Sequence, residues 1–374
     1  MVINYHFFKL EAADLAVFFD VMQHYANASG LFRCAREARE IIESARDTVA
    51  AQLNASSENI IFCSSGTEAN NQVIQQLIHK KVILKQPCHV IVSSIEHSSV
   101  KNAALYLKPF GIELDFCPVG ADGRLDLDAY KALFKPHTSL VSLIYANNEI
   151  GSIQPVKEAV LIAKEHGALT HSDAVQAFGK CKLDVQALGL DFLTVSAHKI
   201  YGPKGAAALY VNDDDTLSPL IHGGGHERQL RAGTENVLAI AGFAAACEQI
   251  DVPRYQAHTL GLKQRFKQGL LETLDAIQFN DTNSGISNTV SLTVKGVDGL
   301  NLAINLDLDG ICVSTGSACS TGSREPSHVL SAIGLSDDLN KSTLRFSFGL
   351  SNTNADIDTA VSRVTDIVTR MRAK

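Results

Sequence analysis

The chain has 374 residues, of which 45% are hydrophobic and 20% are charged, and its formal net charge is −7. This length and composition indicate a globular protein with a sizeable core, built as two domains or as one large α/β domain with an appendage. Lysine and arginine form no conspicuous cluster, which argues against direct nucleic-acid binding. The longest uncharged apolar stretch, residues 237–247, is too short to cross a bilayer, so we expect no membrane binding.

Eight cysteines are spread along the chain, and no two of them have the C-x-x-C spacing of a structural zinc site. We therefore expect no bound metal. The first residues resemble neither a secretory signal nor a transit peptide, so we expect a cytoplasmic protein with reduced thiols. Most of the cysteines lie in apolar surroundings that are typical of small buried side chains.

The first predicted elements are a helix, a strand and a second helix. Residues 35–53 carry apolar side chains at helical spacing, and residues 60–63 form a short apolar strand. Gly66 and Thr67 follow that strand and lead into a helix with apolar residues at 73, 74, 77 and 78. This order leaves free backbone amides at a helix N-terminus, where they can bind an anion such as a phosphate group.

Short apolar strands then alternate with helices between residues 89 and 211. This alternation predicts a mostly parallel sheet with helices on both faces. The expected strands are 89–92, 139–145, 168–171, 192–195 and 206–211, and the expected helices lie near 99–107 and 156–166. In such sheets ligands bind at the carboxyl ends of the strands. Five polar residues stand at or just after such ends and predict one shared site: Thr67, His97, Asn148, Asp173 and Lys199.

The character of the sequence changes near residue 250. A long polar-faced helix is expected over about 254–274, followed by strands at 289–294 and 345–348 and a closing helix at 357–371. We therefore divide the chain into a large domain, residues 1–250, and a smaller C-terminal α+β domain, residues 251–374. The first residues of the chain are free to pack on the smaller domain.

Lys199 is the most informative single residue. It ends an apolar strand and is followed at once by a turn rich in glycine and proline, so its amine is held in place. A held lysine can form a Schiff base with an aldehyde cofactor, although an ordinary strand-end lysine is the commoner case. Asp173 and Gln176 favour the cofactor, because pyridoxal phosphate (PLP) needs a carboxylate beside its ring nitrogen. Ser196 and His198 flank the lysine with groups suited to phosphate oxygens.

Cys319 lies in residues 313–327, a run rich in serine, threonine and glycine that predicts an exposed loop. An exposed cysteine on a loop is not a packing residue, which favours a reactive thiol over an incidental one once a PLP lysine is present. Cys319 is therefore the candidate nucleophile.

Eight motifs, taken in order, closely resemble those of the NifS/IscS-like cysteine desulfurases, PLP enzymes of fold type I in the class V aminotransferase group. The resemblance implies an α/β fold with a mostly parallel sheet in the large domain and a smaller α+β C-terminal domain. The loop around Cys319 resembles the long-loop class that supplies iron–sulfur cluster assembly. The motifs occupy residues 65–70, 96–97, 147–151, 173–176, 196–199, 223–228, 231–234 and 316–319.

The resemblance also implies how PLP is held. Lys199 would carry the cofactor and move the Cα proton of the substrate, while His97 would stack on the ring and assist proton transfer. Asp173 would pair with the ring nitrogen, and Gln176 would bond the ring hydroxyl. The phosphate group would be bound by Gly66, Thr67, Ser196, His198 and, from a neighbouring subunit, Thr234, which implies a homodimer.

The implied reaction converts L-cysteine to L-alanine. Asn148 and Arg345 would hold the substrate carboxylate, for which a planar guanidinium is well suited. Cys319 would take the sulfur as a persulfide and pass it to an acceptor protein, which the sequence does not identify.

Several alternatives stay open. Singly, His97 could cap a helix, Asn148 could form a turn, and Arg345 could pair with a structural acid. The family's usual N-terminal turn is missing from residues 1–10, residues 27–32 lack the expected proline and histidine, and Leu350 replaces a frequent arginine. A selenocysteine lyase, another class V enzyme, or a degenerate PLP-binding subunit with little turnover are therefore the alternative hypotheses.

Overall fold

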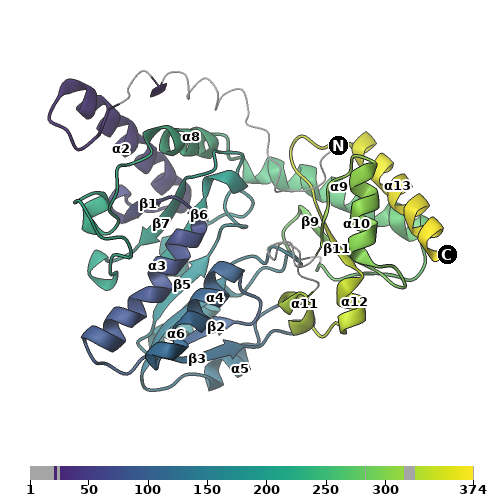
Figure 1. Ribbon diagram of the computed structural model, residues 1–374, viewed down its shortest axis with the longest axis horizontal. Helices are drawn as coiled ribbons and strands as arrows, with labels where there is room; N and C mark the ends of the chain where they lie inside the picture. The colour runs from purple at the N-terminus through teal and green to yellow at the C-terminus, as the bar shows by residue number, and fades with distance from the viewer. Residues whose placement is uncertain (1–20, 23–25, 283, 316–324, 374) are drawn as a thin grey trace.

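A seven-stranded sheet forms the centre of the larger part of the molecule. The computed structural model describes residues 21–22, 26–282, 284–315 and 325–373. Five neighbouring strands are parallel, whereas β7 runs antiparallel to both β6 and β1. The predicted mostly parallel sheet is thus confirmed (Figure 1). In spatial order the strands are β1 (Ile60–Cys63), β7 (Ala207–Val211), β6 (Phe192–Ser196), β5 (Leu169–Asp173), β4 (Thr138–Ile144), β2 (His89–Ser93) and β3 (Glu113–Cys117).

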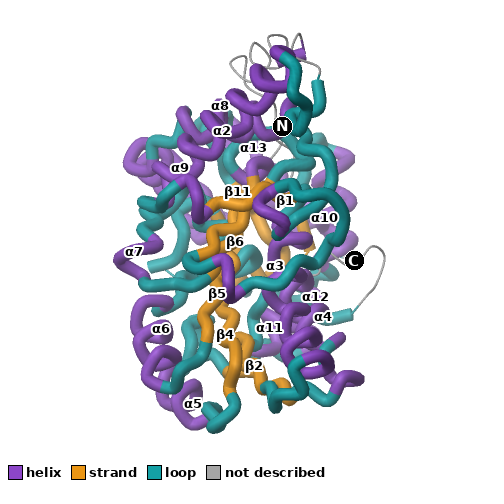
Figure 2. Tube along the Cα trace, turned by 90° about the vertical axis from the view of Figure 1, so that its left-hand side faces the viewer, coloured by secondary structure: helices purple, strands orange, loops and turns teal. Residues whose placement is uncertain are grey.

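Helices cover both faces of this sheet (Figure 2). The strands β7, β6, β4 and β2 are buried along their whole length, as expected for a sheet without a solvent-facing side, although the middle strand β5 is mostly polar. α3 (Gly66–Ile78) and α4 (Ser98–Tyr106) share one apolar cluster with the strands, and α2 (Arg33–Leu53), α6 (Val156–Glu165) and α8 (Val237–Glu248) share another. The short helices α5 (Leu127–Ala132) and α7 (Val185–Leu188) complete this part.

A second sheet of four antiparallel strands forms the other part of the molecule, where β9 and β11 are labelled in Figure 1. Its strands, in spatial order, are β10 (Ser314–Thr315), β11 (Thr343–Ser347), β9 (Thr289–Val294) and β8 (Ile277–Phe279). Around it lie α9 (Val252–Thr273), α10 (Gly299–Leu308), α11 (His328–Ala332), α12 (Asp337–Lys341) and α13 (Asn354–Arg372). The apolar cluster of this sheet draws only on residues 262–371, which supports our proposal of a domain boundary near residue 250.

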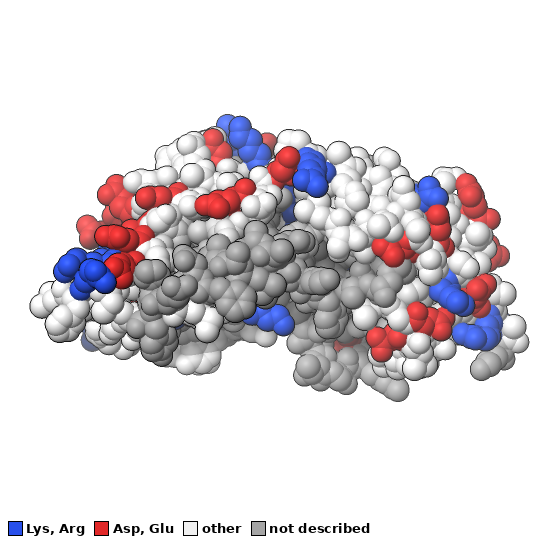
Figure 3. All heavy atoms as spheres, turned by 90° about the horizontal axis from the view of Figure 1, so that it is seen from above, with Lys and Arg blue, Asp and Glu red and all other residues white. Residues whose placement is uncertain are grey.

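Within the described residues, no helix has both the length and the apolar character needed to cross a membrane. Residues 237–247, the most apolar run, belong to α8, whose small side chains pack against α2 inside the protein. On the face shown in Figure 3, acidic and basic side chains are interspersed over the described surface.

The prediction that residues 313–327 form an exposed loop is wrong at both ends of this range. Ser314 and Thr315 form β10, because their backbone pairs with Arg345 and Leu344 of β11 at the edge of the small sheet. Ser327 is buried and caps α11 by accepting from the backbone amides of Val329 and Leu330. Residues 316–324, which include Cys319, lie outside the described residues.

Candidate active site

The carboxyl ends of five strands meet around a pocket at one edge of the large sheet. β1 leads into α3, β2 leads to His97, β4 leads into the turn at residues 147–149, β5 ends at Asp173, and β6 leads through a 3₁₀ turn to Lys199. Five of the predicted site residues were expected here from strand ends alone, and all five line the pocket. Its lining consists of Ser65, Gly66, Thr67, Asn70, His97, Ser99, Ile144, Asn148, Asp173, Val175, Gln176, His198 and Lys199.

The N-terminus of α3 forms one wall of the pocket. Ser65 begins the helix, and its hydroxyl accepts from the backbone amide of Glu68 at 3.1 Å. Gly66 packs so closely against Val175 that a Cβ at this position would lie 2.9 Å from Val175 Cγ2. The backbone amides of the first turn therefore approach the pocket closely, which suits an anionic group.

The carboxylate of Asp173 is fixed by donors on both oxygens. Oδ2 accepts from Asn70 Nδ2 at 2.8 Å, and Oδ1 accepts from the backbone amide of Val175 at 3.0 Å. Asn70 in turn donates to Ser99 Oγ at 2.8 Å. Sequence reasoning missed Asn70, although it falls within the 65–70 motif. The result is a buried carboxylate that cannot turn away from the pocket.

His97 both caps a helix and lines the pocket. It is the residue that precedes α4, and its Nδ1 accepts from the backbone amide of Ser99 at 3.2 Å. The hydroxyl of Ser99 lies 2.8 Å from the same nitrogen. Because Nδ1 accepts a backbone proton, the neutral ring carries its own proton on Nε2. The capping and pocket interpretations of His97 are therefore compatible.

Lys199 is buried with 6% of its surface exposed and sits beside a second buried amine that sequence reasoning missed, Lys180. Lys180 Nζ donates to the backbone oxygen of Gln176 at 2.7 Å and to its side-chain Oε1 at 3.1 Å. Burial, together with the charges of Lys199 and Arg345, lowers the pKa of Lys180. Burial, with the same two lysines, lowers the pKa of His198 to about 4, and Ser196 Oγ lies 2.8 Å from His198 Nδ1.

Arg345 is joined to the pocket through Asn148 but is not part of the described lining. It comes from β11 of the small sheet, where its Nη1 donates to the backbone oxygen of Asn148 at 2.9 Å and its Nη2 donates to Ser314 Oγ at 3.0 Å. The two residues predicted to hold a carboxylate are therefore in direct contact, although they are far apart in the sequence.

Two buried acids next to the pocket were also missed. Glu96 accepts from Ser93 Oγ and from the backbone amide of Ile144, both at 2.6 Å, and burial raises its pKa to about 8. Glu149 accepts from Ser327 Oγ at 2.5 Å, and burial raises its pKa to about 7. Their places in the sequence could have indicated them, because Glu96 immediately precedes His97 and Glu149 immediately follows Asn148.

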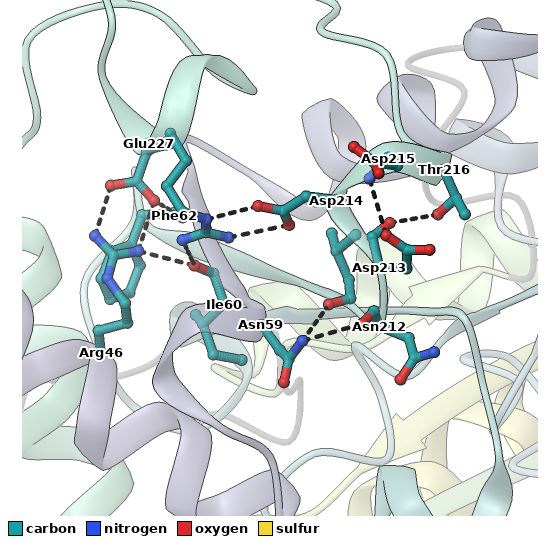
Figure 4. Close-up of polar contacts among 12 residues, drawn as sticks. Arg46, Asn59, Ile60, Phe62, Asn212, Asp213, Asp214, Asp215, Thr216 and Glu227 are labelled. Atoms are coloured by element: carbon teal, nitrogen blue, oxygen red, sulfur yellow. Dashed lines mark hydrogen bonds and ion pairs between the residues drawn. The ribbon is translucent and has the colours of Figure 1, made fainter.

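Thr234 lies away from the pocket of its own chain and is exposed. It follows a left-handed turn in which three successive non-glycine residues, Glu227 to Gln229, have φ values of 43°, 54° and 67°. Figure 4 shows how this turn is held: Glu227 accepts two hydrogen bonds from Arg46, at 2.7 and 2.8 Å, and one from the backbone amide of Phe62 at 2.7 Å. Such a backbone is costly without such support.

A sheet that gathers these groups at its strand ends is characteristic of a known class of enzymes. The family model described as "Aminotransferase class-V" matches residues 17–360, so the chain belongs to this family. Within it, the chain is a NifS/IscS-like protein, as the following relatives show.

Two relatives named "Cysteine desulfurase IscS" are each 37% identical to this chain. The protein of Dictyoglomus turgidum aligns over 353 residues, 94% of this chain and 89% of its own length. The protein of Methanosarcina thermophila aligns over 352 residues, 94% of this chain and 87% of its own. A solved structure titled "NIFS-LIKE PROTEIN" has a TM-score of 0.91 and 30% identity, with 99% of both chains covered. Another, "SspA in complex with cysteine", has a TM-score of 0.83 and 30% identity, covering 94% of this chain and 99% of SspA.

Proposed function

We propose that this protein is a PLP-dependent cysteine desulfurase, a sulfurtransferase that converts L-cysteine to L-alanine and collects the sulfur as a persulfide on Cys319. The observation that carries the proposal is the meeting of Lys199, Asp173 and His97 in one pocket at the strand ends. The relatives named cysteine desulfurase support the same activity.

The pocket residues fit PLP group by group. The carboxylate of Asp173, fixed by Asn70 and the amide of Val175, suits the ring nitrogen. The close approach of the α3 backbone at Gly66 suits the phosphate group, with Thr67 and His198 of the lining as side-chain donors. Ser196, which lies outside the lining, would act next to them through its contact with His198 Nδ1. Lys199 suits the aldehyde. When bound, PLP withdraws electrons from Cα of the substrate, which makes the Cα proton removable.

The chain's own groups then move protons and sulfur. Lys199 takes the Cα proton, and His97 exchanges protons at Nε2, because its Nδ1 is occupied by Ser99. Cys319 Sγ, as a thiolate, attacks the substrate sulfur: the S–S bond forms, the Cβ–S bond breaks, and the electron pair stays on Cβ, which takes a proton. Lys199 then returns a proton to Cα. The products are L-alanine and the Cys319 persulfide.

The substrate carboxylate is proposed to bind at Asn148 and Arg345. Asn148 lines the pocket, and Arg345 brings a fixed positive charge to its edge from the small sheet. A guanidinium offers paired donors that match a carboxylate. Amino acids would thus be recognised between the two sheets.

The proposal includes a homodimer in which Thr234 completes the phosphate site of the other subunit. The exposure of Thr234 beside the supported turn at residues 227–229 favours this role. A sulfur-acceptor protein, in iron–sulfur cluster assembly, would receive the persulfide sulfur. A cytoplasmic location is supported by the seven cysteines of the described residues, all of them free thiols.

The test is to incubate the purified full chain with PLP, L-cysteine and a reductant, and to measure alanine and sulfide. We expect equal amounts of both products. We also expect a yellow protein, in which borohydride reduction fixes the cofactor covalently to Lys199. Cys319→Ala should abolish desulfurase activity while leaving the colour. If alanine formation from cysteine or selenocysteine survives in Cys319→Ala, a lyase is favoured. A coloured wild-type protein with no turnover would indicate a degenerate PLP-binding subunit.

A further inference from the structure

Lys180 is a buried amine next to the pocket with no role in the proposed chemistry. Its side chain is among the largest that are fully buried, and 2% of the residue's surface is exposed. Burying a lysine is costly unless its amine is hydrogen-bonded. Two hydrogen bonds of this amine go to the pocket residue Gln176, one to its backbone oxygen and one to its side-chain oxygen. The position of Lys180 therefore serves Gln176.

The backbone fixes Lys180 as firmly as its amine does. Gly179 precedes it with a φ of 72°, and a Cβ there would lie 2.5 Å from Ile200 Cγ2, so only glycine fits. The carbonyl of Lys180 accepts from Gln256 Nε2 of α9 at 2.7 Å. The amine therefore approaches Gln176 from a direction that the fold sets.

The bond to Gln176 decides which end of its amide faces the pocket. A lysine amine that donates must meet the amide oxygen, since the amide nitrogen is itself only a donor. Lys180 Nζ lies 3.1 Å from Gln176 Oε1, so the N–H₂ group is left on the other side of the amide carbon. Without Lys180, either end of the amide could turn toward a ligand.

We infer that Lys180 is a positioning residue that holds the Gln176 side chain with its N–H₂ toward the pocket, which makes the site select a ring ligand with a hydrogen-bond-accepting oxygen at that edge. The inference rests on the proposed function, in which the ligand is PLP and the oxygen is its ring hydroxyl. It adds to that function the residue that sets the donor polarity of the site.

The test compares the binding of two aldehydes to the cofactor-free full chain by equilibrium titration. The first is PLP, and the second is 3-deoxypyridoxal 5′-phosphate, which lacks the ring oxygen. Wild type should prefer PLP by about tenfold or more, as expected for one well-oriented hydrogen bond. Lys180→Met should reduce this preference at least threefold relative to wild type. Because each variant is compared with wild type as a ratio, the intrinsic difference between the two aldehydes cancels.

Lys182→Met is the matched control, since Lys182 stands two residues further on and is exposed. It should keep the wild-type preference. If Lys180→Met does not fold, Lys180→Gln provides the second variant, and its shorter side chain should lower the preference at least threefold. An unchanged preference in either folded variant would overturn the inference. Failure of wild type to bind either aldehyde would instead overturn the proposed function.

Discussion

Two buried carboxylates in this protein are held in opposite ways. Glu227 meets the guanidinium of Arg46 in a buried ion pair through both carboxylate oxygens, and one of them, Oε2, also accepts from the backbone amide of Phe62. Glu149, at the pocket wall, accepts from the hydroxyl of Ser327 and has a raised pKa of about 7. The first carboxylate supports a strained turn through a full charge. Because burial raises the pKa of the second, it carries less negative charge near neutral pH than an ordinary carboxylate would beside a site for anions.

The difference shows what each region needs. The turn at residues 227–229 must hold an unfavourable backbone, and three hydrogen bonds to one carboxylate supply that support. The pocket gets its geometry from the register of the parallel strands, which brings together the ends of β5, at Asp173, and of β6, which leads to Lys199. A buried ion pair therefore supports the turn, whereas the packing of the strands positions the residues of the pocket.

The largest expected effect comes from breaking the ion pair. Arg46→Met leaves Glu227 buried without its cation, and we expect the free energy of unfolding to fall by about 3–5 kcal/mol. Chemical denaturation of the cofactor-free protein measures it. The matched control is Arg265→Met, which removes a similar two-bond pair with Asp358 at an exposed site and should barely move the midpoint. Equal losses of unfolding free energy in the two variants would contradict the contrast between the buried ion pair and the exposed one.

Some of these residues could be predicted from the sequence and others could not. Asp173 and Lys199 were predictable, because strand ends are readable from apolar runs and the ends of parallel strands meet at one edge. The pairing of Arg46 with Glu227 was not, because the two residues are 181 positions apart and no local pattern links them. Neither was the antiparallel β10, a two-residue strand inside a run of small polar residues.

Lys180 shows a different limit. Lys180 and Lys182 are separated by one residue, yet Lys180 is buried and Lys182 is exposed. No periodic pattern separates them, because the chain there is a turn fixed by Gly179 and not a regular helix or strand. The role of Gln176, by contrast, was implied by a motif resemblance without any knowledge of what holds its amide.

A smaller effect is expected from the pocket-wall carboxyl. The pKa of Glu149 is raised from about 4.5 in the unfolded chain to about 7 in the folded protein, so the folded state binds more protons between these values. Its contribution to stability is therefore complete below about pH 4.5 and is lost as the pH rises through 7. Glu149→Gln keeps an acceptor for Ser327, and should flatten the decline in stability between pH 5 and pH 8 by about 1–3 kcal/mol. The measurement is denaturation at both pH values, and identical slopes for wild type and variant would contradict a protonated Glu149.

The smallest expected effect tests whether close packing, and not charge, shapes the pocket. In Gly66→Ala the new Cβ would lie 2.9 Å from Val175 Cγ2, so either the start of α3 or the Val175 side chain must shift. We expect the dissociation constant for PLP to rise about tenfold, with little change in unfolding. The double variant Gly66→Ala/Val175→Ala removes the obstructing methyl group and should recover most of that affinity. If the double variant binds PLP no better than Gly66→Ala, the loss does not lie in the contact with Val175, and close packing at this point does not shape the pocket.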